Sequence, residues 1–301
     1  MSKHFLASCL ATPWAMDPKY IKSFGDVLVR AYMVKDGKTV AMEDDELDSR
    51  GPLRAGPRQP PKVGGGSIQV ISVKGAIAPY ASDIGMCDGG TSCQDISQQL
   101  KAANADDSVG QILLFIDSPG GNVHGVMELA DEIRASGKPV VAYAGYTAAS
   151  AAYWLGTAAS EFYVAPSGQV GSIGVYMIHQ DVSKAMEAEG VVTKFISAGK
   201  FKTEGNPFEP LSEEAEANLQ QSVDSFYTTF VKAVAQGRNV SVDDVRNDMG
   251  QGRVLDAPAA LKAGMVDGVA TFDQVVAGMQ KKGKKATAAR SRAEIDIAEL
   301  T

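Results

Sequence analysis

The stretch VGQILLFIDSPGG, residues 109–121, is a continuous apolar run that ends in Ser-Pro-Gly-Gly. A strand with apolar side chains in succession is buried on both faces, as in a parallel sheet covered by helices. The next stretch, VHGVMELADEIRAS (123–136), has helical spacing, and KPVVAYAG (138–145) is a second apolar strand. Strands that alternate with helices of this length predict an α/β fold with a parallel sheet.

The same alternation continues on both sides of this unit. An alternating β-rich run, SIQVISVKGAI, precedes it, and a segment with amphipathic helical spacing lies between the two. After it we expect two short strands around a Gly/Ser turn, then a helix, a further strand and a long amphipathic helix capped by Ser212. In order, these expected elements cover residues 67–77, 94–106, 160–176, 181–192, 193–199 and 211–238.

The chain divides into three parts by composition. Residues 1–66 are expected to be an N-terminal extension, because their end is rich in Pro, Gly and Arg and has no periodicity. Residues 67–275 form the predicted folded body. Residues 276–301 are basic and then acidic, which predicts a tail that is disordered or ordered by a partner.

Bulk composition excludes several classes of function. The chain has 301 residues and a net charge of −7, which disfavours generic nucleic-acid binding. Three cysteines, Cys9, Cys87 and Cys93, are too few for a disulfide framework or a zinc site, so we expect reduced thiols and no metal. No stretch approaches the ~20 apolar residues of a membrane span. We therefore expect a soluble protein that is not secreted.

The first candidate for chemistry is DSPGGNV, residues 117–123. A glycine pair after a buried strand exposes backbone N–H groups, and the following helix adds the positive end of its dipole. This combination can cradle an anion or an oxyanion, although a plain strand-to-helix turn has the same sequence. The stretch lacks the G-x-G-x-x-G and G-K-[ST] patterns, which disfavours dinucleotide and P-loop binding.

The second candidate is Ser150, in the stretch YTAASAAYWLG (146–156). A serine among alanines can simply fit a tight helix contact, and we expect a helix here. Alternatively, Ser150 follows a strand and opens that helix, which is where a nucleophile would stand. The N–H of Ala151 would then be placed as an oxyanion donor.

A nucleophilic serine needs a base. The three histidines, His4, His124 and His179, have no evident carboxylate partner in the sequence. The alternative is a lysine, which must be neutral to accept a proton and therefore needs apolar surroundings. Lys200 and Lys202 lie in ISAGKFKTEGNPFEP between aromatic residues, although a lysine at an arbitrary position is far more often a solvated surface charge.

Four motifs together resemble the signal peptide peptidase A (SppA) family of serine peptidases. They are DSPGG (117–121), AASAAY (148–153), GSIGVY (171–176) and SAGKFKTEGNP (197–207), in the family's order and spacing. The resemblance covers roughly residues 67–270. It implies the α/β Clp-protease/crotonase fold, which is built of ββα superhelix units with a parallel sheet.

The resemblance also assigns roles to individual residues. It implies that Ser150 is the nucleophile and Lys202 the general base of a Ser-Lys dyad. Gly120 and Gly121 match the oxyanion loop, with Gly121 favoured as the donor, and Ala151 supplies the second N–H. No metal or cofactor is implied. Members of the family form homo-oligomeric rings, so Lys202 is expected to act on its own Ser150 or on that of a neighbour, with helix 211–238 as a candidate for ring packing.

A narrower resemblance lies at the N-terminus. LASCLATPWAMDPKYI (6–21) is similar to the start of SppA-like peptidases encoded in the head gene clusters of tailed phages. This resemblance implies a capsid maturation protease that cleaves scaffold, capsid or portal proteins within the assembling prohead in the host cytoplasm. It also raises the question of whether the terminal segments are removed by self-cleavage.

Three alternatives stay open at this point. A cellular SppA-like peptidase would degrade signal or other small peptides. A crotonase-like enzyme would use the Gly-Gly loop for a coenzyme A thioester and would need no nucleophilic serine. A structural head protein would keep the fold without activity.

Overall fold

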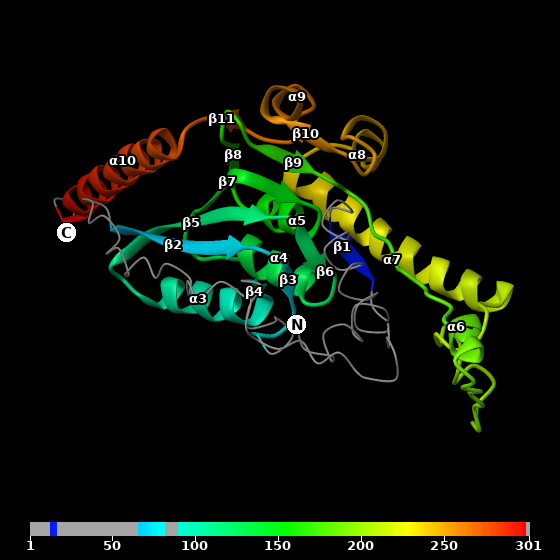
Figure 1. The fold of residues 1–301 in the computed structure, drawn as a ribbon. Helices are drawn as coiled ribbons and strands as arrows, with labels where there is room; N and C mark the ends of the chain where they lie inside the picture. Colours follow the sequence, from blue (N-terminus) through cyan, green and yellow to red (C-terminus); the bar gives the residue numbers. More distant parts are fainter. Residues whose placement is uncertain (1–12, 17–65, 82–89, 299–301) are drawn as a thin grey trace, which may run out of the picture.

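The computed structural model describes residues 13–16, 66–81 and 90–298, and these residues form a layered α/β body (Figure 1). Its larger sheet has seven strands, and a smaller sheet of four strands lies at one end. In the large sheet, β2 (Ser67–Lys74), β5 (Val109–Ser118) and β7 (Val140–Ala149) run parallel to one another. The predicted α/β class with a parallel sheet is therefore confirmed.

Two strands pair with successive parts of β7. Its first half pairs in parallel with β8, and its last three residues, Thr147 to Ala149, pair in parallel with β9. The remaining strands complete the edge, with β10 antiparallel to β9 and β11 parallel to β8. The bounds are β8 Glu161–Val164, β9 Gln169–Gly171, β10 Val254–Asp256 and β11 Gly268–Val269.

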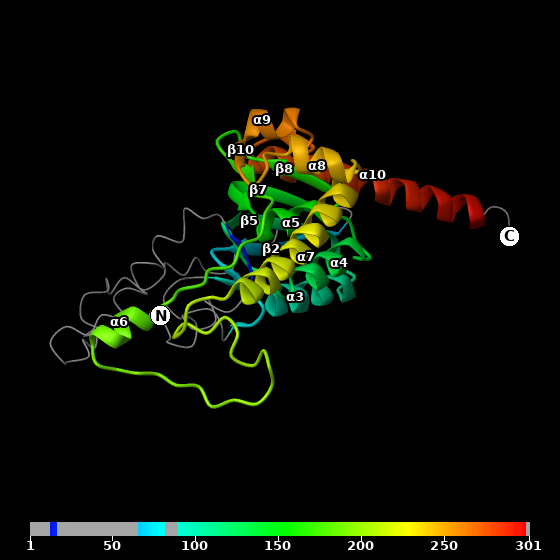
Figure 2. The same ribbon diagram turned by 90° about the vertical axis from the view of Figure 1, so that its right-hand side faces the viewer.

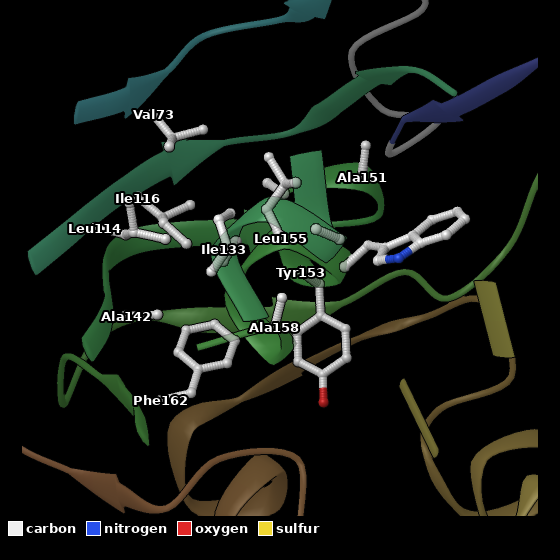
Figure 3. Packing of buried hydrophobic residues seen from close by; sticks show 14 of the residues in the cluster. Val73, Leu114, Ile116, Ile133, Ala142, Ala151, Tyr153, Leu155, Ala158 and Phe162 are labelled. Carbon is white, nitrogen blue, oxygen red and sulfur yellow. The ribbon is translucent and has the colours of Figure 1, made fainter. Parts of the chain in front are cut away.

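Both faces of β5 are buried, as its apolar sequence predicts. Ile112, Leu114 and Ile116 join the main core, whereas Leu113 belongs to a second cluster on the opposite face. This alternation follows from the two-residue period of a strand. The main core receives side chains from α3 (Cys93–Ala105), α4 (Val126–Arg134), α5 (Ala151–Thr157) and α7 (Glu213–Arg238). Figure 3 shows side chains of α5, among them Tyr153 and Leu155, packed with Ile133 of α4 and with side chains of the large sheet.

The smaller sheet includes a strand from the segment that we expected to be only an extension. Its order is β1 (Trp14–Met16), β6 (Gly120–Asn122), β3 (Ile77–Ala78) and β4 (Thr91–Ser92). All three residues of β1 are buried. Residues 13–16 are thus part of the body, and the other residues of the expected extension, apart from Gly66, lie outside the described residues.

The predicted strand over residues 193–199 is wrong for the single chain. These residues pair with no other strand in the described part of the chain and are exposed, and the preceding helix is only the short α6 (Ser183–Ala188). Figures 1 and 2 show that the segment around α6 projects from the body as an arm. A β-rich sequence becomes a strand only where a partner edge is available. We refer to residues 179–210 as the arm.

The tail expected after residue 275 begins inside a helix. Helix α10 (Phe272–Ala298) crosses the expected boundary, and its first turns place Val275 and Met279 against the outer face of the large sheet. Lys282 pairs with Glu161 on β8. The backbone of the tail is therefore helical as far as Ala298, contrary to the expected disorder. In the described part of the chain, no helix combines the length and the apolar character that crossing a bilayer requires.

Helix α7 holds the nearby elements in place at two points. Within the core, the rings of Phe230 and Trp154 stack with their centroids 4.7 Å apart, which fixes α7 against α5. At its C-terminal end, the guanidinium of Arg238 donates two hydrogen bonds to Asp267, at 3.0 and 2.8 Å. The segments α8 (Val242–Asp248) and α9 (Ala257–Lys262) lie between these two partners in the sequence.

The Arg238–Asp267 pair makes stability depend on pH. Burial raises the pKa of Asp267, but hydrogen bonds from Arg238 and from the Phe162 N–H, with the charge of Arg238, outweigh burial and lower it below 3.8. When the pKa of a carboxyl is lower in the folded state, the group stabilises the fold at a pH above its unfolded-state pKa. This contribution is lost as the pH falls through the folded-state pKa.

We expect Asp267→Asn to lower the melting temperature by a few degrees at pH 7 and by less as the pH falls below 3.8. Thermal unfolding between pH 2 and 7 checks this, with exposed Asp107→Asn as control; a gap independent of pH would contradict it.

Candidate active site

Ser150 lies at the turn between β7 and α5 and has an unusual backbone conformation. Its φ is 55° and its ψ is −119°, and the residue is 0 % exposed. Its N–H donates to the Gly171 carbonyl at 2.7 Å, which ties the turn to the end of β9. A positive φ at a residue with a Cβ is sparsely populated, and such strain gathers at functional sites. Of the two interpretations, a strand-to-helix turn fits the structure, and the residue is not within the helix.

The hydroxyl of Ser150 is only loosely held. Its Oγ lies 3.4 Å from the Gly174 carbonyl oxygen, at the limit of a hydrogen bond, and this is its one hydrogen bond among the described residues. Gly174 belongs to the GSIGVY motif that follows β9. The hydroxyl is therefore free of any strong hydrogen bond to the described residues, while the backbone that carries it is fixed.

The glycine loop after β5 packs directly against this turn. Gly120 has φ 96°, and a Cβ added there would lie 2.9 Å from the Ala149 oxygen and 3.0 Å from the Ala151 nitrogen. The loop reaches the turn because β5 and β7 are neighbours and Ser118 is paired with Ala148. The structure therefore brings Gly120 and Ala151 together beside Ser150, and a residue larger than glycine would separate them.

The two glycines differ in what their backbone can offer. The Gly120 N–H donates to Ser118 Oγ at 3.1 Å, and that hydroxyl donates in turn to the Gly75 carbonyl at 2.7 Å. Gly121 lies between two strands, opposite Ala15 of β1 and Ile77 of β3. A Cβ at Gly121 would lie 2.0 Å from the Ile77 oxygen, so this position also requires glycine.

The structure does not bring Lys202 to Ser150 within one chain. Lys202 is exposed on the arm, which lies well away from the β7–α5 turn in both views (Figures 1 and 2). The competing lysine, Lys200, is also exposed, pairs with Glu214 at 3.0 Å and lies 4.3 Å from the centroid of the Phe201 ring. In the single chain, neither lysine is in the dry environment that a neutral base requires.

The histidines do not offer a better base. The His124 ring packs edge-on against Phe226 with centroids 5.6 Å apart, and the Nε2 atom of His179 is buried without a hydrogen bond. Neither ring is hydrogen-bonded to Ser150 or to a carboxylate in the described part of the chain, and His4 lies outside it. Nor do the described residues contain a cluster of side chains that could hold a metal ion.

Cys93 is not a competing nucleophile. The thiol is buried and free, and burial together with the charge of Glu128 raises its pKa to about 12. Because the thiolate is the reactive form, this cysteine is inert at neutral pH. Cys9 and Cys87 lie outside the described residues.

Sequence reasoning missed three groups around Ser150. Ser118 Oγ accepts a hydrogen bond from the Gly120 N–H, and the Gly174 carbonyl accepts one from the Ser150 hydroxyl. Strand β1 pairs with the glycine loop. Ser118 belongs to the Ser-Pro-Gly-Gly motif and Gly174 to the Gly-Ser-Ile-Gly motif. The sequence therefore reveals both motifs but not the hydrogen bond that each of these residues makes. The strand β1 comes from the Pro-Trp-Ala-Met segment, which was noticed only as part of an N-terminal resemblance.

A strained serine at a strand-to-helix turn, with backbone N–H groups gathered beside it, is the arrangement of serine hydrolases that use a nucleophile elbow. Comparison with known families agrees with this class. The model of peptidase family S49 matches residues 132–287, a little more than half of the chain. The chain belongs to peptidase family S49.

Three relatives show the breadth of this similarity. The head-tail preconnector protein GP5 of Enterobacteria phage P21 is 31% identical over 274 residues, which cover 88% of this chain and 54% of GP5. The capsid assembly protease C of Escherichia phage lambda is 30% identical over 276 residues, covering 88% of this chain and 62% of that protein. Protease 4 of Salmonella typhi is 32% identical over 216 residues, covering 71% and 34%. The chain thus spans less than two thirds of the length of each of these relatives, and about one third of Protease 4.

The close approach at Gly120 gives a direct test of the site. We expect Gly120→Ala to slow covalent labelling of Ser150 by a fluorophosphonate at least tenfold, because the added methyl group would lie 2.2 Å from the Ala15 oxygen and 3.0 Å from the Ala151 nitrogen and so forces the loop away from both. The control is Gly278→Ala, where the added Cβ meets nothing within 4 Å. Labelling is measured by mass spectrometry of the modified peptide. Equal rates in Gly120→Ala and the wild type would show that this approach is not needed for reactivity.

Proposed function

We propose that the protein is a serine endopeptidase that uses a Ser-Lys dyad, with Ser150 as nucleophile and Lys202 as general base. The observation that carries this proposal is the strained, fully buried turn at Ser150, which faces the glycine loop in a chain of peptidase family S49. A crotonase-like enzyme would have no use for a strained nucleophile turn. We also assign the fold to the Clp-protease/crotonase type, supported by the parallel sheet of β2, β5 and β7.

The proposed mechanism is acyl transfer without a cofactor. Neutral Lys202 accepts the proton of Ser150 as Oγ attacks the peptide carbonyl, and Lys202 then protonates the leaving amine. The oxyanion is stabilised by the N–H groups of Ala151 and Gly121. We prefer Gly121 to Gly120 because the Gly120 N–H is already hydrogen-bonded to Ser118. Lys202 finally activates the water that hydrolyses the acyl-enzyme.

We propose that Lys202 reaches the Ser150 of a neighbouring copy in a ring. The arm that carries it exposes a group of apolar side chains, among them Val192 at 87 %, Ile196 at 95 % and Phe201 at 50 %. Exposed apolar groups of this kind favour an interaction surface. A second copy of the chain would cover the arm, give residues 193–199 a strand partner and remove Lys202 from water. The same burial would keep the lysine neutral.

We infer that the substrates are phage head proteins, namely scaffold, capsid or portal proteins, cleaved within the assembling prohead in the host cytoplasm. The inference rests on relatives whose names are head-tail preconnector protein and capsid assembly protease, each matched over 88% of this chain. The alternative, a cellular peptidase that degrades signal peptides, is supported by the similarity to Protease 4. The phage function is favoured because the two phage relatives match a larger share of the chain.

The nucleophile is tested by expressing the full chain with its candidate scaffold substrate. We expect the wild type to cleave the scaffold and Ser150→Ala to lose cleavage at least a thousandfold, because no other group can form the acyl-enzyme. The control is Ser167→Ala, an exposed serine in the turn between β8 and β9. Fragments are identified by mass spectrometry. Equal processing by the wild type and Ser150→Ala would refute the proposed nucleophile.

The base and its origin are tested together by mixing two inactive variants. We expect Lys202→Met to be folded and inactive, whereas Lys200→Met keeps activity. Assembly of Lys202→Met with Ser150→Ala should restore part of the activity, because some sites then combine an intact Ser150 with an intact Lys202 from a neighbour. A mixture as inactive as its two components would refute the shared site.

A further inference from the structure

The strand β1 lies between β6 and the backbone of Tyr176, and it pairs with both. On one side it runs antiparallel to β6, with Trp14 opposite Asn122, Ala15 opposite Gly121 and Met16 opposite Gly120. On the other side Trp14 exchanges two backbone hydrogen bonds with Tyr176, at 2.8 and 3.0 Å. An extended segment that adds to a free strand edge is one of the ways in which proteins bind peptides. Figure 1 shows this strand beside β6, at the end of the body where α7 passes.

The ladder fixes which carbonyl of β1 points toward the site. The Val123 N–H donates to the Pro13 carbonyl at 3.3 Å, and hydrogen-bonded pairs alternate along an antiparallel ladder. Two positions further on, Ala15 and Gly121 are therefore the next hydrogen-bonded pair. The Ala15 carbonyl faces the Gly121 N–H, whereas the polar groups of Trp14 face Tyr176.

The same carbonyl lies beside the N–H that follows the serine. A Cβ added to Gly120 would lie 2.2 Å from the Ala15 oxygen and 3.0 Å from the Ala151 nitrogen. The Ala15 carbonyl thus faces the Gly121 N–H and lies on the same side of Gly120 as the Ala151 nitrogen. The N–H groups of Gly121 and Ala151 are those to which the proposed function assigns the oxyanion hole, so Ala15 is placed as the residue before a scissile bond.

The side chains of β1 alternate in a way that suits a bound peptide. Ala15 points into the main core and is 0 % exposed, which leaves room only for a small side chain. Trp14 and Met16 point to the opposite face and form a separate cluster with Ala76 and Tyr176. Trp14 also borders a cavity of about 620 Å³ together with Asn122 and His124. The large neighbours anchor the strand, and the small residue lies opposite Gly121 of the glycine loop.

We propose that the Ala15–Met16 peptide bond is a self-processing site, at which the enzyme removes its own residues 1–15. This inference rests on the proposed function, because it requires Ser150 and its base. Ser150 Oγ forms an ester with the Ala15 carbonyl carbon, the Ala15–Met16 C–N bond breaks, and the Met16 nitrogen takes the proton from the base. Water then hydrolyses the ester, releases the Ala15 carboxylate and returns the hydroxyl to Ser150.

The inference also defines how other substrates bind. They enter as an extended strand antiparallel to β6 with a small residue opposite Gly121, and they compete with β1 for one groove. An uncut chain therefore blocks its own site, and the cut opens it.

The test uses the full chain in its assembled form, as wild type, Ser150→Ala, Ala15→Arg and the conservative control Ala15→Ser. N-terminal sequencing and intact mass report processing, and a fluorogenic peptide that contains Pro-Trp-Ala-Met reports turnover. We expect the wild type and Ala15→Ser to begin at Met16, and Ser150→Ala to keep residues 1–15. Ala15→Arg should slow this cut at least tenfold, because arginine does not fit the buried position. The displaced strand then no longer blocks the site, so this variant should still hydrolyse the added peptide.

The outcomes separate this inference from the proposed function. A wild type that hydrolyses the peptide through Ser150 yet keeps residues 1–15 would overturn self-processing and leave the peptidase proposal intact. Loss of residues 1–15 in Ser150→Ala would also overturn it, because another protease would then make the cut. A wild type inactive on both its own N-terminus and the peptide would overturn both proposals. If Ala15→Arg fails to fold, the comparison of wild type, Ser150→Ala and Ala15→Ser still decides the question.

Discussion

The backbone of Ser150 has to be held in a conformation that a residue with a Cβ rarely adopts, and much of the surrounding structure serves this constraint. A residue at φ 55° and ψ −119° costs on the order of 1–3 kcal/mol, so its neighbours must make every alternative worse. Strand β7 enters the turn between β5 and β9, and the Gly171 carbonyl takes the Ser150 N–H. Helix α5 leaves the turn with all seven of its residues buried, and α7 fixes it through the stacked rings of Trp154 and Phe230. The strain is therefore offset by core packing and by the backbone hydrogen bond from Ser150 to Gly171.

The same constraint explains the two glycines after β5. Parallel strands end at one edge of a sheet, so the loop that follows β5 meets the turn that follows β7. At this edge, backbone must approach backbone from three sides: from the serine turn, from β1 and from β3. Gly120 and Gly121 allow it because an added Cβ would lie 2.2 Å from the Ala15 oxygen at the first and 2.0 Å from the Ile77 oxygen at the second. Ser118 fixes the loop further, because its hydroxyl accepts a hydrogen bond from the Gly120 N–H. The following residue, Gly121, lies opposite β1.

The sequence predicts the elements that depend on local pattern and misses those that depend on a distant partner. The apolar runs of β5 and β7 follow from periodicity, and the structure agrees with them, except that β7 continues to Ala149 through residues expected to be helical. The sequence left the Ser150 turn as one of two interpretations, and the structure decides for it. Residues 193–199 have a strand-like sequence but find no partner edge among the residues that the structure describes, so their exposed state could not be predicted from composition. Strand β1 is only three residues long, too short for any periodicity, and exists because β6 and Tyr176 offer it two edges. The charged tail looked disordered, yet its alanines, lysines and arginines are good helix formers and continue α10 from a packed first turn.

Two features of the single chain, the separation of the proposed base from the proposed nucleophile and the pairing of β1 with β6 beside the glycine loop, have a common physical consequence. On the proposed function, one chain alone cannot act on a substrate, because Lys202 is solvated on the arm and β1 covers the backbone donors. Assembly would bury the arm and supply a neutral lysine, and β1 would be the first peptide in place when this happens. An intramolecular strand has a high effective concentration at its own site, so it is bound ahead of any free substrate until the Ala15–Met16 bond is cut. The order of events would then be set by connectivity: assembly first, removal of the N-terminal segment second, and access for other chains last.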